Sequence, residues 1–178
     1  MEGAVEVSGL ISSIGAGVLA LVFARSAAHK VAEFSFFSAT LDDYRLLPAL
    51  FVGPAAIALT VAEAMVIALL IIPYTRAAGA ASAMFLLSLY ATAMAINLQR
   101  GRARIDCGCG GPGQMISWPL VVRNLLLAGA ASFVAMYTAA FDHIPAGTLV
   151  AFAGILLCWL LLAIFDQVIG NRSHARAI

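Results

Sequence analysis

The sequence predicts an all-α integral membrane protein, a single-domain bundle of about five transmembrane helices. Of its 178 residues, 63% are hydrophobic and only 11% are charged. A chain of this composition cannot cover itself with a polar surface in water. A helix needs about 20 apolar residues to cross about 30 Å of hydrocarbon, so there is room for five spans at most. We expect membrane lipid, and no nucleic acid, among its partners.

Five apolar segments are the candidate spans, and they lie at about 8–24, 48–73, 78–98, 118–141 and 145–165. The first is short and rich in glycine, and a signal peptide is the alternative for it. A signal peptide begins with basic residues, whereas the first charges here are Glu2 and Glu6, so we expect a retained span. Because lipid offers backbone amides no hydrogen bonds, the spans must be helices, which pack through small residues such as Gly79.

The segment at about 28–46, between the first two spans, has a helical periodicity of its own. Its apolar and polar residues occupy opposite faces, with Val31, Phe34, Phe37, Leu41 and Tyr44 on one and Lys30, Glu33, Ser38, Asp42 and Asp43 on the other. This pattern predicts an amphipathic helix in the membrane interface, and the alternative is a plain connector. Pro48 ends the segment and suits the start of the next helix.

Two of the three cysteines lie in a loop at about 99–117, after the third span. Cys107 and Cys109 stand one residue apart in "DCGCGGPG", whereas Cys158 lies in the apolar fifth span and is expected to act as a small hydrophobe. A disulfide between residues i and i+2 closes a small and strained ring, and strain is typical of catalytic disulfides. We therefore expect Cys107 and Cys109 to form an internal disulfide that exchanges with other thiols.

The surroundings of the pair favour redox chemistry over metal binding. Gly108, Gly110 and Gly111 allow the turns that so small a ring demands. Nearby cations lower the pKa of a thiol, and four arginines flank the pair: Arg100, Arg102, Arg104 and Arg123. Two thiolates could instead hold copper(I), but zinc would need four ligands, and no histidine has ligand spacing to the pair: His29, His143 and His174. We predict no metal site, and an incidental glycine-rich loop is the remaining alternative.

Two charged residues inside the spans indicate a polar site. A charge in hydrocarbon costs on the order of 3 kcal/mol, so Glu63 and Arg123 must face the bundle interior or water. Arg123 and its neighbour Asn124 are expected to stabilise a thiolate or hold an electron acceptor, and Glu63 to handle a proton. The alternative is a structural ion pair or hydrogen bonds between helices. Tyr90 and Asn97 are further candidates for the same site and for binding a cofactor.

Four stretches resemble the MauE family of membrane proteins, which is grouped with the DoxX-like redox-associated proteins. They are "HKVAEFSFFSATLDDYRLLP", "VAEAMVIALLIIP", "ARIDCGCGG" and "ISWPLVVRNLLLAGAA". The likeness covers about 25–135 and is most specific at 105–130. Family members often carry Phe where this chain has Gly110, a departure that concerns the partner packed on the loop and leaves both thiols in place.

The resemblance implies a role in the maturation of methylamine dehydrogenase, whose small subunit carries many disulfides and a tryptophan-derived quinone. It also implies a thioredoxin-like partner, MauD, and makes Cys107 and Cys109 the exchanging pair. The arrangement is similar to the four-helix core of vitamin K epoxide reductase and DsbB, which pass electrons between thiols and a quinone. Those proteins use Cys-x-x-Cys, so the shorter spacing here leaves a quinone cofactor open.

The resemblance places the protein in the inner membrane of a bacterium, with the cysteine loop in the periplasm. The positive-inside rule favours the opposite orientation. Only Arg76 lies on the other side, whereas the thiol side carries Arg25, Lys30, Arg45, Arg100, Arg102, Arg104, Arg172 and Arg176. Because cytosolic thiols are kept reduced, an oxidising loop has little purpose there, and we expect a periplasmic loop.

Three classes of function follow. The leading hypothesis is a thiol–disulfide redox component that supports disulfide formation in a periplasmic client. The second is a non-catalytic scaffold or chaperone that docks the client or its partner through the amphipathic segment and the loop. The third is a membrane protein that handles copper(I). Replacing Cys107 and Cys109 by serine separates a redox protein from a scaffold.

Overall fold

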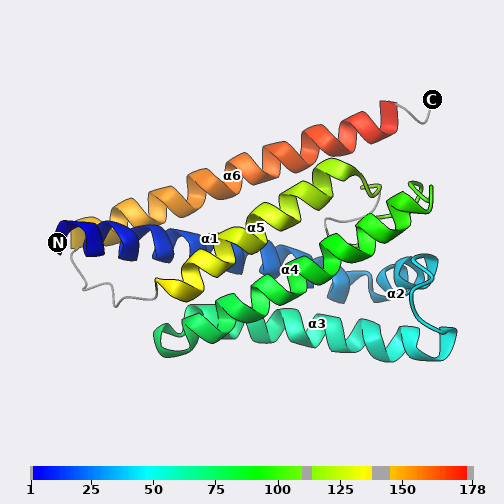
Figure 1. Ribbon diagram of the computed structural model, residues 1–178, viewed down its shortest axis with the longest axis horizontal. Helices are drawn as coiled ribbons and strands as arrows, with labels where there is room; N and C mark the ends of the chain where they lie inside the picture. Colours follow the sequence, from blue (N-terminus) through cyan, green and yellow to red (C-terminus); the bar gives the residue numbers. More distant parts are fainter. Residues whose placement is uncertain (1, 110–113, 138–144, 176–178) are drawn as a thin grey trace.

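The computed structural model of the chain describes residues 2–109, 114–137 and 145–175, and these form a helical bundle (Figure 1). The predictions for Gly110, Gly111, His143 and Arg176 fall outside these residues, as do the side chains of Arg172 and His174. In order, the elements are α1 (Glu2–Ala32), α2 (Phe34–Asp43), α3 (Ala49–Ile71), the 3-10 turn η1 (Pro73–Thr75), α4 (Arg76–Gln99), α5 (Trp118–Met136) and α6 (Pro145–Ala175). No strand occurs in the described part of the chain.

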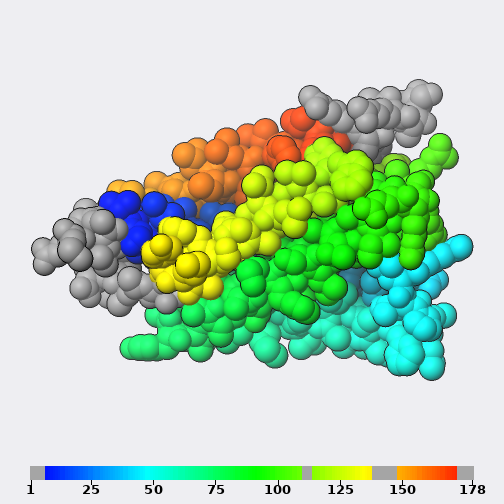
Figure 2. All heavy atoms as spheres, in the orientation of Figure 1, coloured from blue at the N-terminus to red at the C-terminus, as the bar shows by residue number. Residues whose placement is uncertain are grey.

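In the part of the chain that the structure describes, five helices are long and apolar enough to cross a membrane, which confirms the predicted multi-pass membrane protein. The membrane-spanning parts are Val7–Ala32, Ala49–Ile71, Pro73–Gln99, Trp118–Met136 and Thr148–Asn171. In Figure 2, α4, α5 and α6 lie side by side on one face of the molecule. These helices carry large exposed apolar side chains, among them Phe85, Leu126 and Leu161, as a surface in contact with lipid requires.

Helix α1 is at the centre of the bundle, because it packs against α3, α5 and α6, while α4 packs against α3 and α5. The core between them contains Leu19, Phe23 and Leu70, which are almost completely buried. Gly79 at the start of α4 has the predicted close contact. A Cβ atom there would lie 2.8 Å from the backbone of Leu70, so only glycine allows this approach of α3 and α4.

The first helix is longer than the sequence indicates. The apolar run stops near residue 24, whereas α1 continues to Ala32. Lys30, which we expected on the polar face of an interfacial helix, lies instead in the last turn of α1 and is only 1% exposed. Val31, expected on the apolar face, is 69% exposed. The sequence pattern was misleading because it assumes that a lysine faces water, whereas this one has a buried partner.

The remainder of the expected interfacial helix is α2, and its side chains follow the predicted faces only in part, because Phe34, expected on the apolar face, is 38% exposed. Phe37, Thr40 and Tyr44 are buried, whereas Asp42 and Asp43 are exposed. As expected, Pro48 precedes the first residue of α3 and marks the start of that helix. The buried face of α2 contacts the cysteine loop, as described below.

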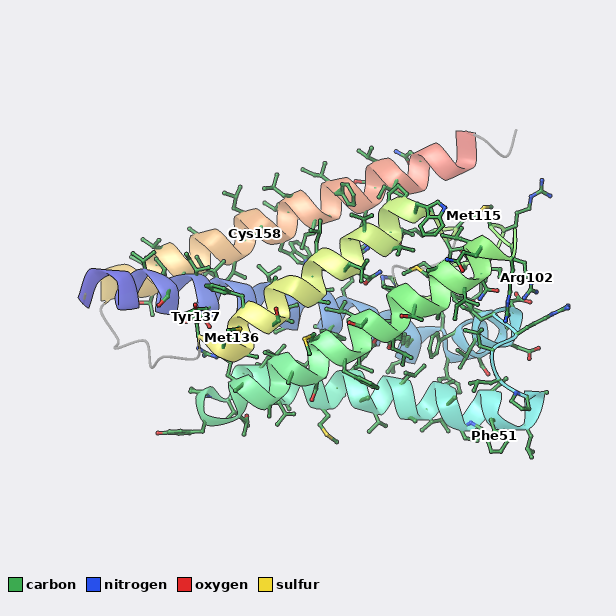
Figure 3. All side chains as sticks on the ribbon, in the orientation of Figure 1. Phe51, Arg102, Met115, Met136, Tyr137 and Cys158 are labelled. Carbon is green, nitrogen blue, oxygen red and sulfur yellow. The ribbon has the colours of Figure 1, made fainter. Side chains whose placement is uncertain are left out.

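The last two spans also differ from the expected bounds. Helix α5 ends at Met136, and residues 138–144 lie outside the described part of the chain. Helix α6 continues past residue 165 to Ala175 and so includes Asp166. The loop between α4 and α5 lies at the end of the bundle that Arg102 and Met115 mark, whereas Met136 and Tyr137 mark the opposite end (Figure 3).

Candidate functional site

The cysteine loop folds back on itself as a short hairpin. The amide of Ile116 donates to the carbonyl of Ile105 at 2.8 Å, and the amide of Cys107 donates to the carbonyl of Gln114 at 2.7 Å. Gly108, between the two cysteines, has a φ of +72°. This is the left-handed region that glycine adopts without strain. The loop conformation thus depends on the glycine that separates the thiols.

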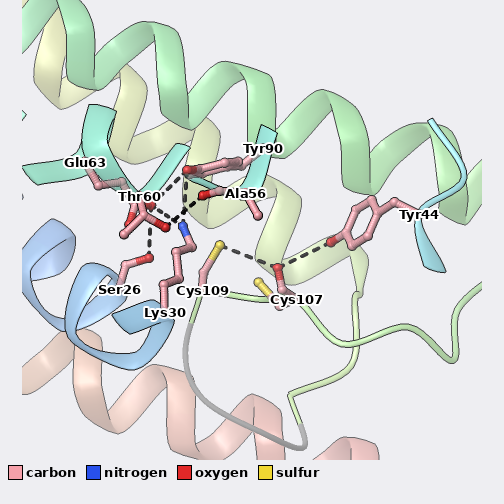
Figure 4. Close-up of polar contacts among 9 residues, drawn as sticks. All are labelled: Ser26, Lys30, Tyr44, Ala56, Thr60, Glu63, Tyr90, Cys107 and Cys109. Carbon is pink, nitrogen blue, oxygen red and sulfur yellow. Dashed lines mark hydrogen bonds and ion pairs between the residues drawn. The ribbon is translucent and has the colours of Figure 1, made fainter. Parts of the chain in front are cut away.

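Cys107 is the enclosed member of the pair. It is 6% exposed, and its Sγ lies 3.9 Å from Sδ of Met94 on α4. Its carbonyl oxygen accepts hydrogen bonds from the hydroxyl of Tyr44 at 3.4 Å and from the thiol of Cys109 at 3.6 Å (Figure 4). The end of α2 therefore covers this thiol from one side and α4 from another.

Replacing Gly108 by alanine is expected to expose Cys107. A left-handed alanine costs roughly 1–2 kcal/mol, which would raise the population of an opened loop by a factor of roughly 5–30. The new Cβ would make only ordinary contacts, 3.5 Å from the ring of Phe37, so the effect comes from the backbone. The measurement is the rate of alkylation of Cys107 in the folded protein, read by mass spectrometry.

A matched control is Gly101→Ala, because Gly101 has nearly the same φ, +73°, and open space around it. This variant pays the same backbone strain at a distance from the thiols. It should leave the alkylation of Cys107 unchanged. Equal effects of the two variants would show that general destabilisation, and not the loop, controls access to the thiol.

Cys109 is the accessible member of the pair. It is only partly buried, and it lines a small cavity of about 20 Å³. A cavity of this size has room for about one water molecule. The walls come from α1, α5 and α6, through Val22, Arg25, Arg123, Trp159, Leu162, Ala163 and Asp166. The cavity contains two cations and one carboxylate, so its polarity suits an anionic sulfur.

The two thiols differ in acidity as well as in exposure. A hydrogen bond from Cys107 and the nearby charges of Lys30 and Arg123 lower the pKa of Cys109 to about 7, although burial and the Glu63 carboxylate act in the opposite direction. The same hydrogen bond to Cys109, together with burial, raises the pKa of Cys107 well above its usual value. At neutral pH the thiolate of the pair therefore resides on Cys109.

A buried ion pair lies beside the thiols. The ammonium of Lys30 on α1 pairs with Oε1 of Glu63 on α3, and the side chains are 1% and 0% exposed. The same oxygen accepts hydrogen bonds from the hydroxyl of Ser26 at 3.1 Å and from that of Tyr90 at 2.8 Å (Figure 4). The four residues come from α1, α3 and α4, so they join three helices at the level of the loop.

The ammonium of Lys30 also contacts two aromatic rings. Its Nζ lies 4.7 Å from the ring centre of Phe37 on α2 and 4.8 Å from that of Tyr90 on α4. It donates a further hydrogen bond to the Tyr90 hydroxyl at 3.2 Å. Such contacts are favourable for a desolvated cation. They hold the ammonium between the carboxylate and the cysteine loop.

Arg123 pairs with an aspartate on α6 and not with Glu63, the other charge inside the expected spans. Its Nη1 lies 2.5 Å from Oδ1 of Asp166 on α6, and Arg25 lies 3.9 Å from the other oxygen of that carboxylate. The side chain of Gln114 in the loop donates to the backbone carbonyl of Asp166 at 3.3 Å. Arg123 thus reaches the Cys109 cavity as one member of an ion pair.

The remaining predicted site residues are only partly brought together. Tyr90 joins the Glu63 group, whereas Asn97 donates to Ala93 of its own helix at 3.1 Å and accepts from Arg102 at 3.4 Å. Asn124 also bonds its own helix, through the carbonyl of Leu120 at 2.9 Å. Glu63, Tyr90 and Arg123 therefore lie around the thiols, whereas Asn97 and Asn124 form hydrogen bonds within or near their own helices.

Sequence reasoning missed two site residues, Lys30 and Asp166. Lys30 was assigned to an exposed helix face, and Asp166 directly follows the expected end of the last span. A usable signal was present in both cases, because each lies within a few residues of a long apolar run and an ionisable group there needs a partner. Among the described residues there is no cluster of three His, Cys, Asp or Glu side chains that could hold a metal ion.

Comparison with known proteins identifies the same protein family along most of the chain. The family model described as "Methylamine utilisation protein MauE" matches residues 8–137. The methylamine utilization protein MauE of Paracoccus denitrificans is 37% identical over 162 residues, 89% of this chain and 86% of the relative. That of Methylorubrum extorquens is 33% identical over 162 residues, which cover 89% of this chain and 87% of the relative. No solved structure shows a significant match.

Proposed function

This chain belongs to the MauE family of methylamine utilisation proteins, and from that premise we propose that it is a membrane thiol–disulfide exchange protein. Cys107 and Cys109 form the exchanging pair. A thioredoxin-like protein of the MauD type is the partner, and a periplasmic protein rich in disulfides, the small subunit of methylamine dehydrogenase, is the client. The protein lies in the bacterial inner membrane with its loop in the periplasm, which labelling of Cys109 on whole cells with an impermeant maleimide tests.

One observation carries the proposal, namely the asymmetry of the two thiols. Cys109 faces a polar cavity and has a pKa of about 7, whereas Cys107 is enclosed and has a raised pKa. Thiol exchange needs one accessible sulfur for the mixed disulfide and a second sulfur, held next to it, that closes the ring. The described loop supplies both, one residue apart.

The exchange proceeds in two displacement steps. A thiolate of the reduced partner attacks Sγ of Cys109 in the oxidised protein, and Cys107 leaves and takes up a proton. The second partner thiolate then attacks the partner's own sulfur in the mixed disulfide, and Cys109 leaves as a thiolate. The partner loses two electrons and becomes a disulfide, while the pair here becomes a dithiol. The low pKa of Cys109 favours the second step, because a weakly basic thiolate leaves readily.

Arg123 and Lys30 are the groups that stabilise this leaving thiolate, since both lower the pKa of Cys109. Glu63 is the candidate proton-handling residue. The resemblance also implies a quinone, but the cavity beside Cys109 has room for about one water molecule and does not fit a quinone ring. The described site accounts for exchange between thiols without such a ring.

Serine variants test the proposal. We expect Cys109→Ser to abolish formation of a mixed disulfide. We expect Cys107→Ser to trap one with a partner that keeps a single active-site cysteine, supplied as its disulfide with a small thiol, because neither Cys107 nor a second partner thiol can then resolve it. Both variants should lose support of methylamine dehydrogenase maturation in a strain that lacks the native protein. Cys158→Ser is the matched control, since this half-buried cysteine lies in α6, and it should behave as the parent. The measurement is non-reducing electrophoresis with mass spectrometry of the cross-linked species.

The alternatives make different predictions for the same variants. A scaffold that docks its partner through α2 and the loop would keep supporting maturation without either thiol. Copper(I) binding is favoured by one observation, the third soft sulfur that Met94 brings within 3.9 Å of Cys107. In that case copper would copurify with the reduced protein and be lost from both serine variants. Normal maturation by the double serine variant would overturn the redox proposal.

A further inference from the structure

Glu63 is a buried carboxylate with an uneven set of partners. All of its hydrogen bonds, from Ser26, Lys30 and Tyr90, converge on Oε1. Its other oxygen, Oε2, is buried and has no hydrogen-bond partner among the described residues. A charged oxygen left unsatisfied away from water is costly. A proton on Oε2 would neutralise that oxygen and so lower this cost, and it would leave every bond to Oε1 in place.

Cys109 and Glu63 lie on opposite sides of the Lys30 ammonium (Figure 4). The charge of Lys30 favours the Cys109 thiolate, whereas the charge of Glu63 disfavours it. One buried cation therefore faces two groups that can each be an anion. Two anions beside a single cation would leave an excess negative charge in a medium of low dielectric, so the arrangement favours one anion at a time.

We propose that Lys30 is a counter-ion shared by the Glu63 carboxylate and the Cys109 thiolate, and that Glu63 accepts on Oε2 the proton that Cys109 releases. This inference rests on the proposed exchange function and assigns it a proton acceptor and a fixed charge. The S–H bond of Cys109 breaks and an O–H bond forms on Glu63, with no electron transferred. Before and after the transfer the three groups carry the same total charge. The step therefore creates no net charge inside the bundle.

Other ionisable groups face Cys109 from every helix around it. They are Arg25 on α1, Tyr44 after α2, Tyr90 on α4, Arg123 on α5, Asp166 on α6 and Cys107 in the loop. Asp166 is already engaged by Arg123 at 2.5 Å. The Lys30–Glu63 pair differs, because its carboxylate keeps one oxygen free to take a proton. This is why the transfer is assigned to Glu63 and not to Asp166.

The test compares the direction in which two variants shift the pKa of Cys109, measured in the reduced, full-length protein in lipid nanodiscs. Alkylation of Cys109 by iodoacetamide is followed against pH by mass spectrometry, which reports the pKa of that thiol. Lys30→Gln should raise the pKa of Cys109 by about one unit or more, the usual effect of losing an adjacent opposite charge. Glu63→Gln should lower it, because Lys30 then has the thiolate as its only anion. In the double variant Lys30→Gln with Glu63→Gln, the pKa of Cys109 should be higher than in Glu63→Gln alone.

Two further variants keep the test decisive. Thr60→Val removes a hydroxyl that donates to the carbonyl of Ala56 on α3, the helix that carries Glu63. This variant should leave the pKa of Cys109 unchanged. Lys30→Arg retains the charge and should keep the pKa of Cys109 near that of the parent. If Lys30→Gln fails to fold, the pKa of Cys109 in Glu63→Gln and in Lys30→Arg still tests the proposal. A purely structural role of the pair predicts shifts of the same sign, or none, and that result would overturn the proposal.

Infrared spectroscopy tests the proton directly. The reduced-minus-oxidised difference spectrum near neutral pH should contain the carbonyl band of a protonated carboxylic acid. This band should be absent from Glu63→Gln and from Cys109→Ser, and its persistence in either variant would refute the assignment to Glu63. Both measurements use the protein without a partner. Failure of thiol exchange with the partner would therefore refute the proposed function and leave this inference standing, and the reverse also holds.

Discussion

Removing one member of the Lys30–Glu63 pair is expected to lower the free energy of unfolding by about 3–5 kcal/mol, whereas replacing both is expected to be nearly neutral. Glu63→Leu leaves a buried ammonium, and Lys30→Met leaves a buried carboxylate, each without its counter-charge. The pair is almost completely enclosed, so water cannot supply the lost interaction. The double variant Lys30→Met with Glu63→Leu removes both charges and fills the space with apolar groups.

The measurement is unfolding of the purified protein in mixed micelles as the fraction of denaturing detergent rises. Asp43→Leu is the control, because this aspartate is exposed on α2 and its replacement therefore removes no buried charge. It should change the free energy of unfolding by no more than about 0.5 kcal/mol. Single variants as stable as the parent would contradict the enclosed ion pair, and a double variant that loses the sum of both single effects would show that the two charges do not stabilise each other.

Replacing Arg123 by methionine is expected to raise the pKa of Cys109 from about 7 by about one unit. The cation lines the same cavity as the thiol, and its charge favours the thiolate. Near pH 7 the reactivity of Cys109 should therefore fall by up to about tenfold, since one unit of pKa is a tenfold change in the ionisation constant. Arg123→Lys should keep part of the effect, because it retains the charge and loses the planar fork that meets Asp166.

The matched control is Asp166→Asn, which breaks the same ion pair and leaves the cation in the cavity. This variant should lower the pKa of Cys109 or leave it unchanged, the opposite of Arg123→Met. Alkylation of Cys109 against pH, normalised to folded protein, measures both. If Arg123 serves only to join α5 to α6, the two variants will reduce the yield of folded protein alike, and the pH profile of the surviving fraction will not move.

Much of the site could be anticipated from the energetic cost of placing charge in lipid. Glu63 and Arg123 interrupt apolar spans, so the sequence alone indicates that each is turned inward and partnered. The identity of the partner could not be anticipated in the same way. Both of the real partners, Lys30 and Asp166, lie at the ends of apolar runs, where a charge can equally reach water and where span boundaries are least certain.

Composition and segment length by themselves determined the fold class and the number of spans. These properties depend on the apolar content of each segment and on the thickness of the bilayer, which act on every segment separately. Only the tertiary structure decided that Cys107 is enclosed and Cys109 accessible, and that Lys30 stands between Glu63 and the loop. The physical reason is that these relations depend on how the helices are rotated and staggered against one another, and that choice is made by the packing of the whole bundle.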